Sequence, residues 1–217
     1  MKRLVIFSDS LALPRNIPEI TFLEDTYPYL LKEHFDVYQY SKGGGRISDL
    51  LLQTFYYNQY KPDVIIIQCG IVDCAPRAFT YNEEKFFESN YLGKFIRKLL
   101  SKTITTKTIR NLRHKSWTEE RIFKKECKDF INQFPTVPIF ALSILPPSYE
   151  YEISVPGISN KIEIYNKILE DIFGNHLISL NDIPEEGIMS DFHHLNKIGH
   201  NYVFDEVLTK LREYNII

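Results

Sequence analysis

Short apolar runs alternate with longer helix-like segments along this chain, and this alternation constrains the fold more than any other feature of the sequence. Such runs are typical of strands that helices cover on both faces. The predicted strands are Leu4–Phe7, Phe35–Tyr40, Val64–Gln68, Ile139–Leu142 and His176–Leu180, and the predicted helices are Tyr27–Glu33, Ile47–Tyr57, Asn82–Leu100, Glu119–Phe134, Lys161–Phe173 and Lys197–Tyr214. Because strands and helices alternate, we predict an α/β protein with a parallel central sheet.

One segment interrupts the alternation. Between Lys94 and Lys128 the chain is rich in Lys and Arg, and only Glu119, Glu120 and Glu126 oppose this charge. We predict a basic helical insertion over about residues 94–134 within a single domain spanning residues 1–217. The insertion is either a solvated surface, as most charged runs are, or a cationic lid or docking face for an anionic substrate, partner or membrane surface.

The composition excludes several classes of protein. With 217 residues, of which 44% are hydrophobic, the chain can bury a core and is not expected to be disordered. A net charge of −2 gives no global positive field for binding nucleic acid. The three cysteines are odd in number and lack the spacing of a zinc site, so we expect reduced thiols at Cys69, Cys74 and Cys127.

The start of the chain does not resemble a targeting signal. Lys2 and Arg3 precede only the short apolar run Leu4–Phe7, whereas a signal peptide needs roughly 7–15 apolar residues. No run approaches the roughly 20 apolar residues of a membrane span. We therefore expect no transmembrane segment and a cytoplasmic location, while the oligomeric state is left open.

Residues that follow the predicted strands are candidates for a site, because parallel sheets bind ligands beyond the carboxyl ends of their strands. Ser8–Ser10 follows the first strand, where a serine hydroxyl and its N–H can face a pocket. Gly43–Gly45 precedes a helix, where backbone N–H groups can approach a negative charge. Ser, Asp and Gly are also ordinary turn and capping residues, so neither loop defines a site alone.

Two further loops carry polar residues. In Gly70–Arg77, Asp73 can cap a helix, and Arg77 either pairs with Asp73 or faces a pocket. Asp191 and His194 stand three residues apart before the last helix. A carboxylate at this spacing can fix the histidine tautomer and leave the other ring nitrogen to act as a base. A metal site is not expected, because no third ligand stands at a recognisable spacing.

Taken together, the four loops follow the order of a Ser-His-Asp hydrolytic site. In these loops the sequence resembles the SGNH, or GDSL-like, hydrolase family. Ser8–Leu11 is similar to the family's G-D-S-L block, with Ser8 in place of glycine. Gly70–Asp73 is similar to the G-x-N-D block, and Asp191–His200 is similar to the D-x-x-H-L-N-x-x-G-H block.

The resemblance implies a three-layer α/β/α, flavodoxin-like fold and ester hydrolysis through an acyl-enzyme. It makes Ser10 the nucleophile, His194 the general base and Asp191 the group that orients the imidazole. The N–H of Ser10 and that of Gly45, or failing that Gly44, would donate to the oxyanion. No cofactor is expected. The other residues predicted around the pocket are Asp9, Gly70, Asp73 and Arg77.

Val72 departs from the family pattern, in which an Asn side chain supplies a third oxyanion donor. A valine side chain cannot donate a hydrogen bond, and losing one such donor typically costs about 2.7–4 kcal/mol of transition-state stabilisation. The protein is then a weak enzyme, or uses another donor such as Arg77 or Gln68, or no longer transfers acyl groups. His193 is interpreted as a structural neighbour of the site.

These residues favour a serine esterase that removes an acetyl or short acyl group from a carbohydrate or small ester. Relatives of this kind act on lipid esters, acetylated sugars and thioesters, so the acyl group is not identified. One alternative is an O-acetyl- or acyltransferase that acts on a glycan precursor. Another is a weakly catalytic or non-catalytic carbohydrate-binding protein. The expected partner is a small-molecule or glycan ester, and not nucleic acid.

Overall fold

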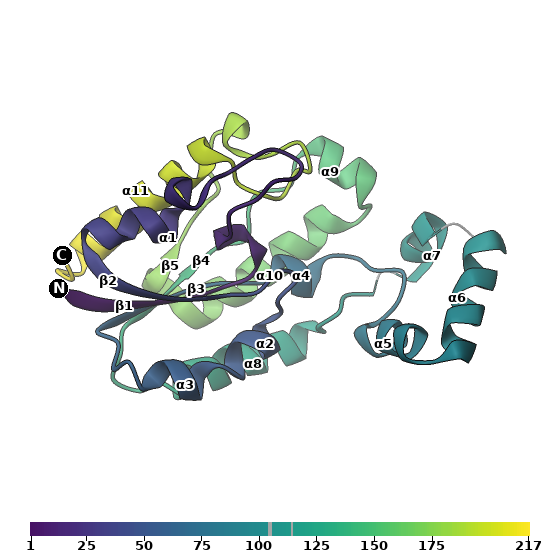
Figure 1. Ribbon diagram of the computed structural model, residues 1–217, viewed down its shortest axis with the longest axis horizontal. Coiled ribbons are helices and arrows are strands. Elements are labelled where there is room, and N and C mark those ends of the chain that lie inside the picture. The colour runs from purple at the N-terminus through teal and green to yellow at the C-terminus, as the bar shows by residue number, and fades with distance from the viewer. Residues whose placement is uncertain (104–105, 114) are drawn as a thin grey trace.

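Five parallel strands form one sheet at the centre of the protein (Figure 1). The structure is a computed structural model that describes residues 1–103, 106–113 and 115–217, without the side chains of residues 99–107 and 111. In the order in which they lie across the sheet, the strands are β2 (Phe35–Ser41), β1 (Lys2–Ser8), β3 (Val64–Gln68), β4 (Ile139–Leu142) and β5 (Leu177–Ile178).

The strand order reverses between β1 and β3. From β1 the chain moves outward to β2, and it then crosses back past β1 to β3 and continues to β4 and β5. Ser8 at the end of β1 is in register with Gln68 at the end of β3. The loops after these two strands therefore open at one point, where ligands of such sheets bind.

Helices cover both faces of the sheet and complete three layers (Figure 1). Right-handed crossovers send the connections that run in opposite directions along the sheet to opposite faces. One face carries α1 (Tyr27–Leu30) and α11 (Lys197–Glu213), and the other carries α2 (Ile47–Leu51), α3 (Thr54–Asn58), α8 (Glu120–Asn132) and α10 (Ile158–Phe173). The α/β/α fold class expected from the sequence is confirmed.

The central strands are apolar along their whole length because both of their faces are covered. Every side chain from Leu4 to Phe7 is inaccessible to solvent, and the Phe7 ring lies 5.0 Å from the ring of Phe130 on α8. The three cysteines are free and buried. Burial of these apolar side chains supplies most of the driving force that holds the layers together.

Three helices project beyond the carboxyl end of the sheet: α5 (Tyr81–Ser89), α6 (Tyr91–Thr103) and α7 (Thr106–Arg113) (Figure 1). They share a small apolar cluster of Ala78, Phe79 and Phe87. Arg113 joins α7 to α5 by donating two hydrogen bonds to the Glu83 carboxylate, at 2.9 and 3.0 Å. We propose that the chain is one domain that carries these helices as an insertion.

The predicted helix Asn82–Leu100 is wrong, because the chain turns at Asn90 between α5 and α6. Gly93 allows the close approach that follows this turn, since a Cβ there would lie 2.3 Å from the Phe86 carbonyl oxygen. A single helical periodicity in the sequence does not reveal such a break. The predicted helix Ile47–Tyr57 is likewise divided, into α2 and α3.

The remaining elements are short. The last predicted strand, His176–Leu180, shrinks to the two residues of β5, and α7 and α9 (Tyr149–Ser154) were not predicted. No helix in the described ranges is long and apolar enough to cross a membrane. The other short helical turns are η1 (Ser10–Ala12), η2 (Leu23–Asp25), η3 (Leu31–Glu33), α4 (Ile71–Cys74), η4 (Gly174–His176) and η5 (Glu185–Gly187).

Candidate active site

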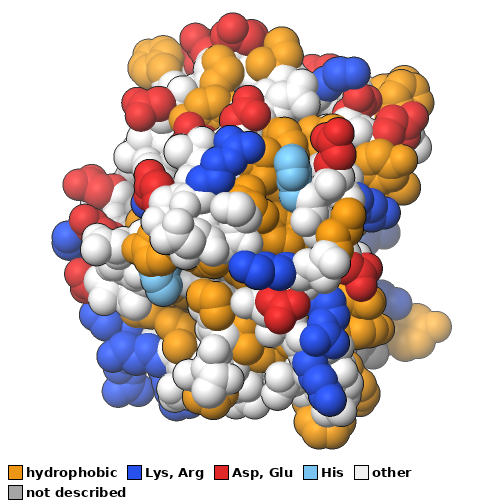
Figure 2. Space-filling view, turned by 90° about the vertical axis from the view of Figure 1, so that its left-hand side faces the viewer, with side chains coloured by type: hydrophobic (Ala, Val, Ile, Leu, Met, Phe, Trp, Pro, Cys, Tyr) orange, Lys and Arg blue, Asp and Glu red, His pale blue; other side chains and the backbone are white. Residues whose placement is uncertain are grey.

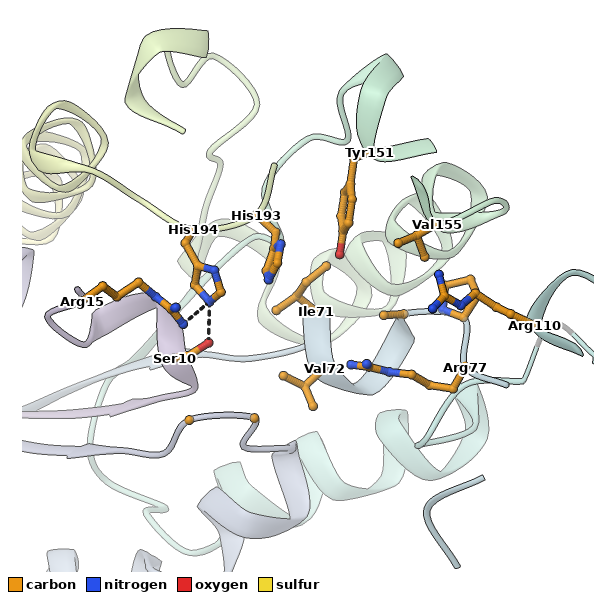
Figure 3. A pocket seen from close by; sticks show the side chains of 14 residues that line it. Ser10, Arg15, Ile71, Val72, Arg77, Arg110, Tyr151, Val155, His193 and His194 are labelled. Atoms are coloured by element: carbon orange, nitrogen blue, oxygen red, sulfur yellow. Dashed lines mark hydrogen bonds between the residues drawn. The ribbon is translucent and has the colours of Figure 1, made fainter. Parts of the chain in front are cut away.

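A pocket of about 500 Å³ opens at the carboxyl end of the sheet, where the strand order reverses (Figure 3). Loops after β1, β2 and β3 form its floor, α7 and α9 form one side, and the loop before α11 forms the other. The lining residues are Ser10, Arg15, Gly43, Gly44, Ile71, Val72, Ala75, Pro76, Arg77, Arg110, Tyr151, Val155, His193 and His194.

Ser10 begins the turn η1 directly after β1. Its predecessor Asp9 is fully buried and accepts a hydrogen bond from the Leu11 N–H at 2.9 Å, which fixes the turn. The Ser10 hydroxyl lies 2.9 Å from Nε2 of His194, although the two residues are 184 positions apart in the sequence. The turn thus presents the serine to the histidine that the sequence predicted as its base.

Asp191 holds His194 from the opposite side of the ring. One carboxylate oxygen of Asp191 lies 2.6 Å from Nδ1 of His194, and the other accepts the His194 backbone N–H at 3.1 Å. This pairing favours the tautomer with the proton on Nδ1, which leaves the Nε2 lone pair toward Ser10. The predicted Ser10, His194 and Asp191 therefore converge in one hydrogen-bonded chain.

The Asp191 carboxylate is stabilised in its ionised form. Partial burial opposes ionisation, but the hydrogen bond from His194 and the neighbouring His193 and His194 rings outweigh it and lower the pKa of Asp191. Burial lowers the pKa of His193, whose ring stacks on that of Tyr151 with centroids 5.5 Å apart. A charged acceptor therefore faces His194 at neutral pH.

Arg15 is a pocket residue that no sequence motif predicts. Its guanidinium Nη2 donates to Nε2 of His194, the same atom that faces Ser10 (Figure 3). A reciprocal pair of backbone hydrogen bonds with Thr21, each 2.9 Å, anchors the loop that carries Arg15. Burial lowers the pKa of Arg15, and the nearby Asp191 and Asp9 carboxylates counteract this effect. An isolated arginine in a loop gave no signal in the sequence.

The glycine turn favours Gly44 over Gly45 as a backbone donor toward Ser10. The Gly45 N–H already donates to the Lys42 carbonyl at 2.9 Å, and Gly45 does not line the pocket. Gly44 lines it with a φ of +66°, a conformation that other residues rarely adopt. Val72 also lines the pocket, so an apolar side chain lies where the family pattern has Asn.

Three of the predicted pocket residues, Asp9, Gly70 and Asp73, do not reach the pocket lining. Asp73 accepts hydrogen bonds from Thr118 Oγ1 at 2.6 Å and from the Ile47 N–H at 3.2 Å. Burial raises the pKa of both Asp9 and Asp73 to about 7. These acids support the loops from beneath, as ordinary capping residues do.

Gly70 and Gln68 also act within the scaffold. Gly70 has a φ of +121°, and a Cβ there would lie 2.7 Å from the Ile144 side chain. The Gln68 side-chain oxygen Oε1 accepts hydrogen bonds from the Tyr27 hydroxyl at 2.9 Å and from the Ser8 hydroxyl at 3.2 Å. Gln68 does not line the pocket, which leaves Arg77 as the only one of the two suggested replacement donors that faces it.

Arg77 and Arg110 lie across the pocket from Ser10 (Figure 3). Arg77 does not pair with Asp73. Its guanidinium instead lies 4.4 Å from the centre of the Trp117 ring. Arg110 comes from α7 of the insertion and donates to the Ser154 carbonyl at 3.1 Å. The basic insertion therefore contributes a cation to the same pocket as the serine.

In the part of the chain that the structure describes, Asp191, His193 and His194 are the one group of three ligand atoms close enough to hold a metal ion, all within 4.8 Å of one another. Within this group, the Asp191 carboxylate and His194 Nδ1 already share a hydrogen bond of 2.6 Å. This geometry fits a carboxylate that orients a histidine better than it fits a metal centre.

The fold is similar to those of solved lipases and esterases. The lipase/acylhydrolase from Enterococcus faecalis aligns with a TM-score of 0.67 and 14% identity, covering 99% of this chain and 97% of that one. A GDSL-like lipase from Bacteroides thetaiotaomicron aligns with a TM-score of 0.61 and 12% identity, covering 100% and 89%. The acetyl xylan esterase AlAXEase aligns with a TM-score of 0.61 and 16% identity, covering 95% and 98%.

These similarities confirm the fold that the sequence motifs imply, the GDSL-type α/β/α fold. Each alignment covers nearly the whole of both chains, so the insertion does not obscure the common architecture. No protein-family model and no curated protein sequence matches this chain.

Proposed function

We propose that this protein is a serine ester hydrolase of the SGNH type. The observation that carries the proposal is the hydrogen-bonded chain from Ser10 Oγ through His194 to Asp191, at 2.9 and 2.6 Å. It lies at the point where the strand order reverses, inside a pocket of about 500 Å³. A hydroxyl, a neutral imidazole and a carboxylate in this order activate a serine for attack on a carbonyl carbon.

In the first half of the reaction, Ser10 Oγ attacks the ester carbonyl carbon while its proton moves to Nε2 of His194. The tetrahedral intermediate then collapses, the bond to the alcohol breaks, and His194 returns the proton to the departing alkoxide. Water repeats the sequence on the acyl-enzyme and releases a carboxylic acid and free Ser10. The ionised Asp191 stabilises the imidazolium that forms in each half.

Donors to the oxyanion are fewer than in the family pattern. The N–H groups of Ser10 and Gly44 supply two, and the Val72 side chain supplies none. One missing donor typically costs about 2.7–4 kcal/mol of transition-state stabilisation. We therefore infer a slower enzyme, unless a cation of the pocket such as Arg77 replaces the missing donor.

An acetyl or other short acyl ester of a carbohydrate or small molecule is the substrate class we infer. A pocket of about 500 Å³ lies toward the small end of the range for ligand sites. One solved protein with a similar fold is described as an acetyl xylan esterase, which supports a carbohydrate ester. A cytoplasmic location stays a prediction from the sequence.

The test is covalent labelling of Ser10 together with turnover of p-nitrophenyl acetate. We expect a fluorophosphonate to label the wild-type protein, and Ser10→Ala to lose both labelling and hydrolysis. His194→Ala should lose hydrolysis as well. Ser8→Ala is a matched control, because Ser8 belongs to the same motif but donates to Asp9 and Gln68 outside the pocket.

Equal labelling of the wild-type and Ser10→Ala proteins would contradict the proposal. Complete absence of labelling would favour a non-catalytic binding protein. Product analysis with an added sugar alcohol separates the remaining alternative. Transfer of the acyl group to that alcohol in preference to water would assign the same acyl-enzyme to an acyltransferase.

A further inference from the structure

The pocket contains more positive charge than acyl transfer requires. Three of its lining residues are arginines, Arg15, Arg77 and Arg110, and none is Asp or Glu. The opposite end of the molecule, where the strands begin, shows acidic and basic side chains interspersed (Figure 2). The excess of cations is therefore a local property of the pocket, in a chain whose net charge is −2.

Among the described residues, none of these three arginines has a carboxylate partner, and Arg77 and Arg110 lie together at the end of the pocket away from Ser10 (Figure 3). Among the described residues, no Asp or Glu oxygen lies within 4.0 Å of Arg77 or Arg110. The undescribed side chains, at positions 99–107, 111 and 114, include no Asp or Glu. Arg113, on the same helix as Arg110, shows the contrast, because it pairs with Glu83 at 2.9 Å.

Hydrogen-bonding capacity is also unused at these two arginines. The Nε atoms of Arg77 and Arg110 are buried and have no hydrogen-bond partner within the described part of the protein. Ile71, Val72 and Val155 form the adjacent wall of the pocket (Figure 3). An apolar wall weakens solvent screening, so two unpaired guanidinium groups beside it make a strong local field for an anion.

The electrostatics agree with this description. Burial lowers the pKa of Arg77, whereas Tyr151 and, from beyond ion-pair distance, Glu84 oppose this shift, and the nearby charge of Arg110 adds to it. Stacking on Trp117 fixes the plane of the Arg77 guanidinium. A bound anion would relieve the repulsion between the two cations and satisfy their free N–H groups.

We propose that Arg77 and Arg110 bind a carboxylate or phosphate group of the substrate, so that the ester cleaved at Ser10 is an anionic one. Carboxylates and phosphates share the planar or tetrahedral oxygen pairs that a guanidinium fork recognises. This inference rests on the proposed function only where it says that the substrate is an ester. The anion site itself stands on the arginines alone.

Figure 3 shows how such a substrate would lie. Ser10 and His194 occupy one end of the pocket, and Arg77 and Arg110 the other, with Val72 between them. An ester placed at Ser10 would extend past Val72 and present its anionic group to the arginines. The basic insertion then has a specific role, because its helix α7 supplies one of the two cations.

The experiment measures binding to the Ser10→Ala protein, so that turnover does not affect the result. Monomethyl succinate is compared with its neutral dimethyl ester, and 2-acetoxyethyl phosphate with neutral 2-acetoxyethanol. Calorimetry gives the affinities. Fluorescence of Trp117, the one tryptophan of the chain, reports on Arg77 directly because the two side chains are stacked.

We expect the anionic member of at least one pair to bind about tenfold more tightly or better than its neutral partner. In the same background, Arg77→Gln and Arg110→Gln should each weaken binding of the anionic ligand about tenfold, and Arg110→Gln should leave binding of the neutral ligand unchanged. Arg110→Lys should recover part of the loss. Arg212→Gln, an exposed site on α11, removes the same charge and should change neither affinity.

The carboxylate and phosphate pairs identify which group is bound. Equal affinity for charged and neutral members of both pairs would overturn the anion site. So would an equal loss of charged and neutral binding in Arg110→Gln, because that residue would then not recognise the negative charge. Labelling of Ser10 without charge selectivity would refute the anion site and support the proposed esterase. Charge selectivity without labelling of Ser10 would support the anion site and refute the proposed esterase.

Discussion

The two ends of the pocket differ in how completely their polar atoms are paired. At the serine end (Ser10, His194 and Asp191), the serine hydroxyl, both imidazole nitrogens and both carboxylate oxygens have partners between 2.6 and 3.3 Å. At the arginine end (Arg77 and Arg110), two guanidinium Nε atoms are buried without one. Ser10, His194 and Asp191 are thus paired in the free protein, whereas the Nε of the adjacent Arg15, like those of Arg77 and Arg110, is buried without a partner among the described residues.

This difference suggests a division of roles, in which the serine end carries out the reaction and the arginine end selects the substrate. The serine end is built by loops of the α/β/α core, in the arrangement that a hydrolytic reaction needs before any substrate arrives. The arginine end depends on the insertion, since Arg110 belongs to α7 and Trp117 follows it in the chain. On the proposed function, the core loops would supply the reaction and the inserted segment would select the ester.

The largest expected effect tests whether the serine end is preassembled. Asp191→Asn should lower kcat for p-nitrophenyl acetate by about three to four orders of magnitude, because an amide cannot hold His194 in the same tautomer or stabilise its charged form. Steady-state hydrolysis measures this. A loss below about tenfold would show that the 2.6 Å pairing of Asp191 with His194 does not serve catalysis.

The next effect concerns Val72, which lies between the two ends, and tests whether the oxyanion lacks a donor there. Val72→Asn should raise kcat for a neutral acetate ester about tenfold, because the amide adds a donor toward the oxyanion. Val72→Ala is the matched control, since it removes bulk without adding a donor. If both variants change kcat equally, the wild-type protein does not lack a donor at this position, and Arg77 becomes the leading replacement.

A smaller effect concerns Arg15, the cation at the serine end. Its Nη2 and the Ser10 hydroxyl both face the single lone pair of His194 Nε2, so they compete for it. Arg15→Met removes the competitor, and we expect kcat/KM for p-nitrophenyl acetate to rise about fivefold, the value of about one hydrogen bond. A fall in kcat/KM for this neutral ester would instead make Arg15 part of the machinery.

The last effect is on stability instead of activity, and it concerns the support beneath Ser10. Burial raises the pKa of Asp9 from its ordinary 3.8 to about 7. The folded protein therefore holds this proton to higher pH than the unfolded chain does, and the wild-type protein loses stability as pH rises through that interval. Asp9→Asn cannot ionise and keeps an acceptor for the Leu11 N–H.

The free energy of unfolding of Asp9→Asn, relative to wild type, should thus increase by about 2–3 kcal/mol between about pH 5 and about pH 8. Urea unfolding of both proteins at the two pH values measures the difference. Contributions from buried groups that are not coupled to Asp9, such as His200, cancel in this comparison. A constant difference would show that Asp9 is ionised throughout.

Much of the serine end follows from local sequence. Ser10, Asp191 and His194 stand in short motifs whose loops end parallel strands, and parallel strands bring their carboxyl ends to one edge. Val64–Gln68 and Ile139–Leu142 are strands over their predicted ranges, because an apolar run between polar turns marks a buried strand. The break at Asn90 and the pairing of Gly45 with Lys42 depend on backbone turns that apolar periodicity does not encode.

The sequence by itself determined the α/β/α fold and which serine, histidine and aspartate to examine, because both follow from patterns within short segments. The tertiary structure alone decided that Arg15 faces His194 and that Arg77 and Arg110 share one pocket wall. Arginines are frequent on protein surfaces, and their long side chains give no sign in the sequence of where they end. Only the position of the insertion beyond the carboxyl end of the sheet shows which cations lack a carboxylate partner and line the pocket of the serine.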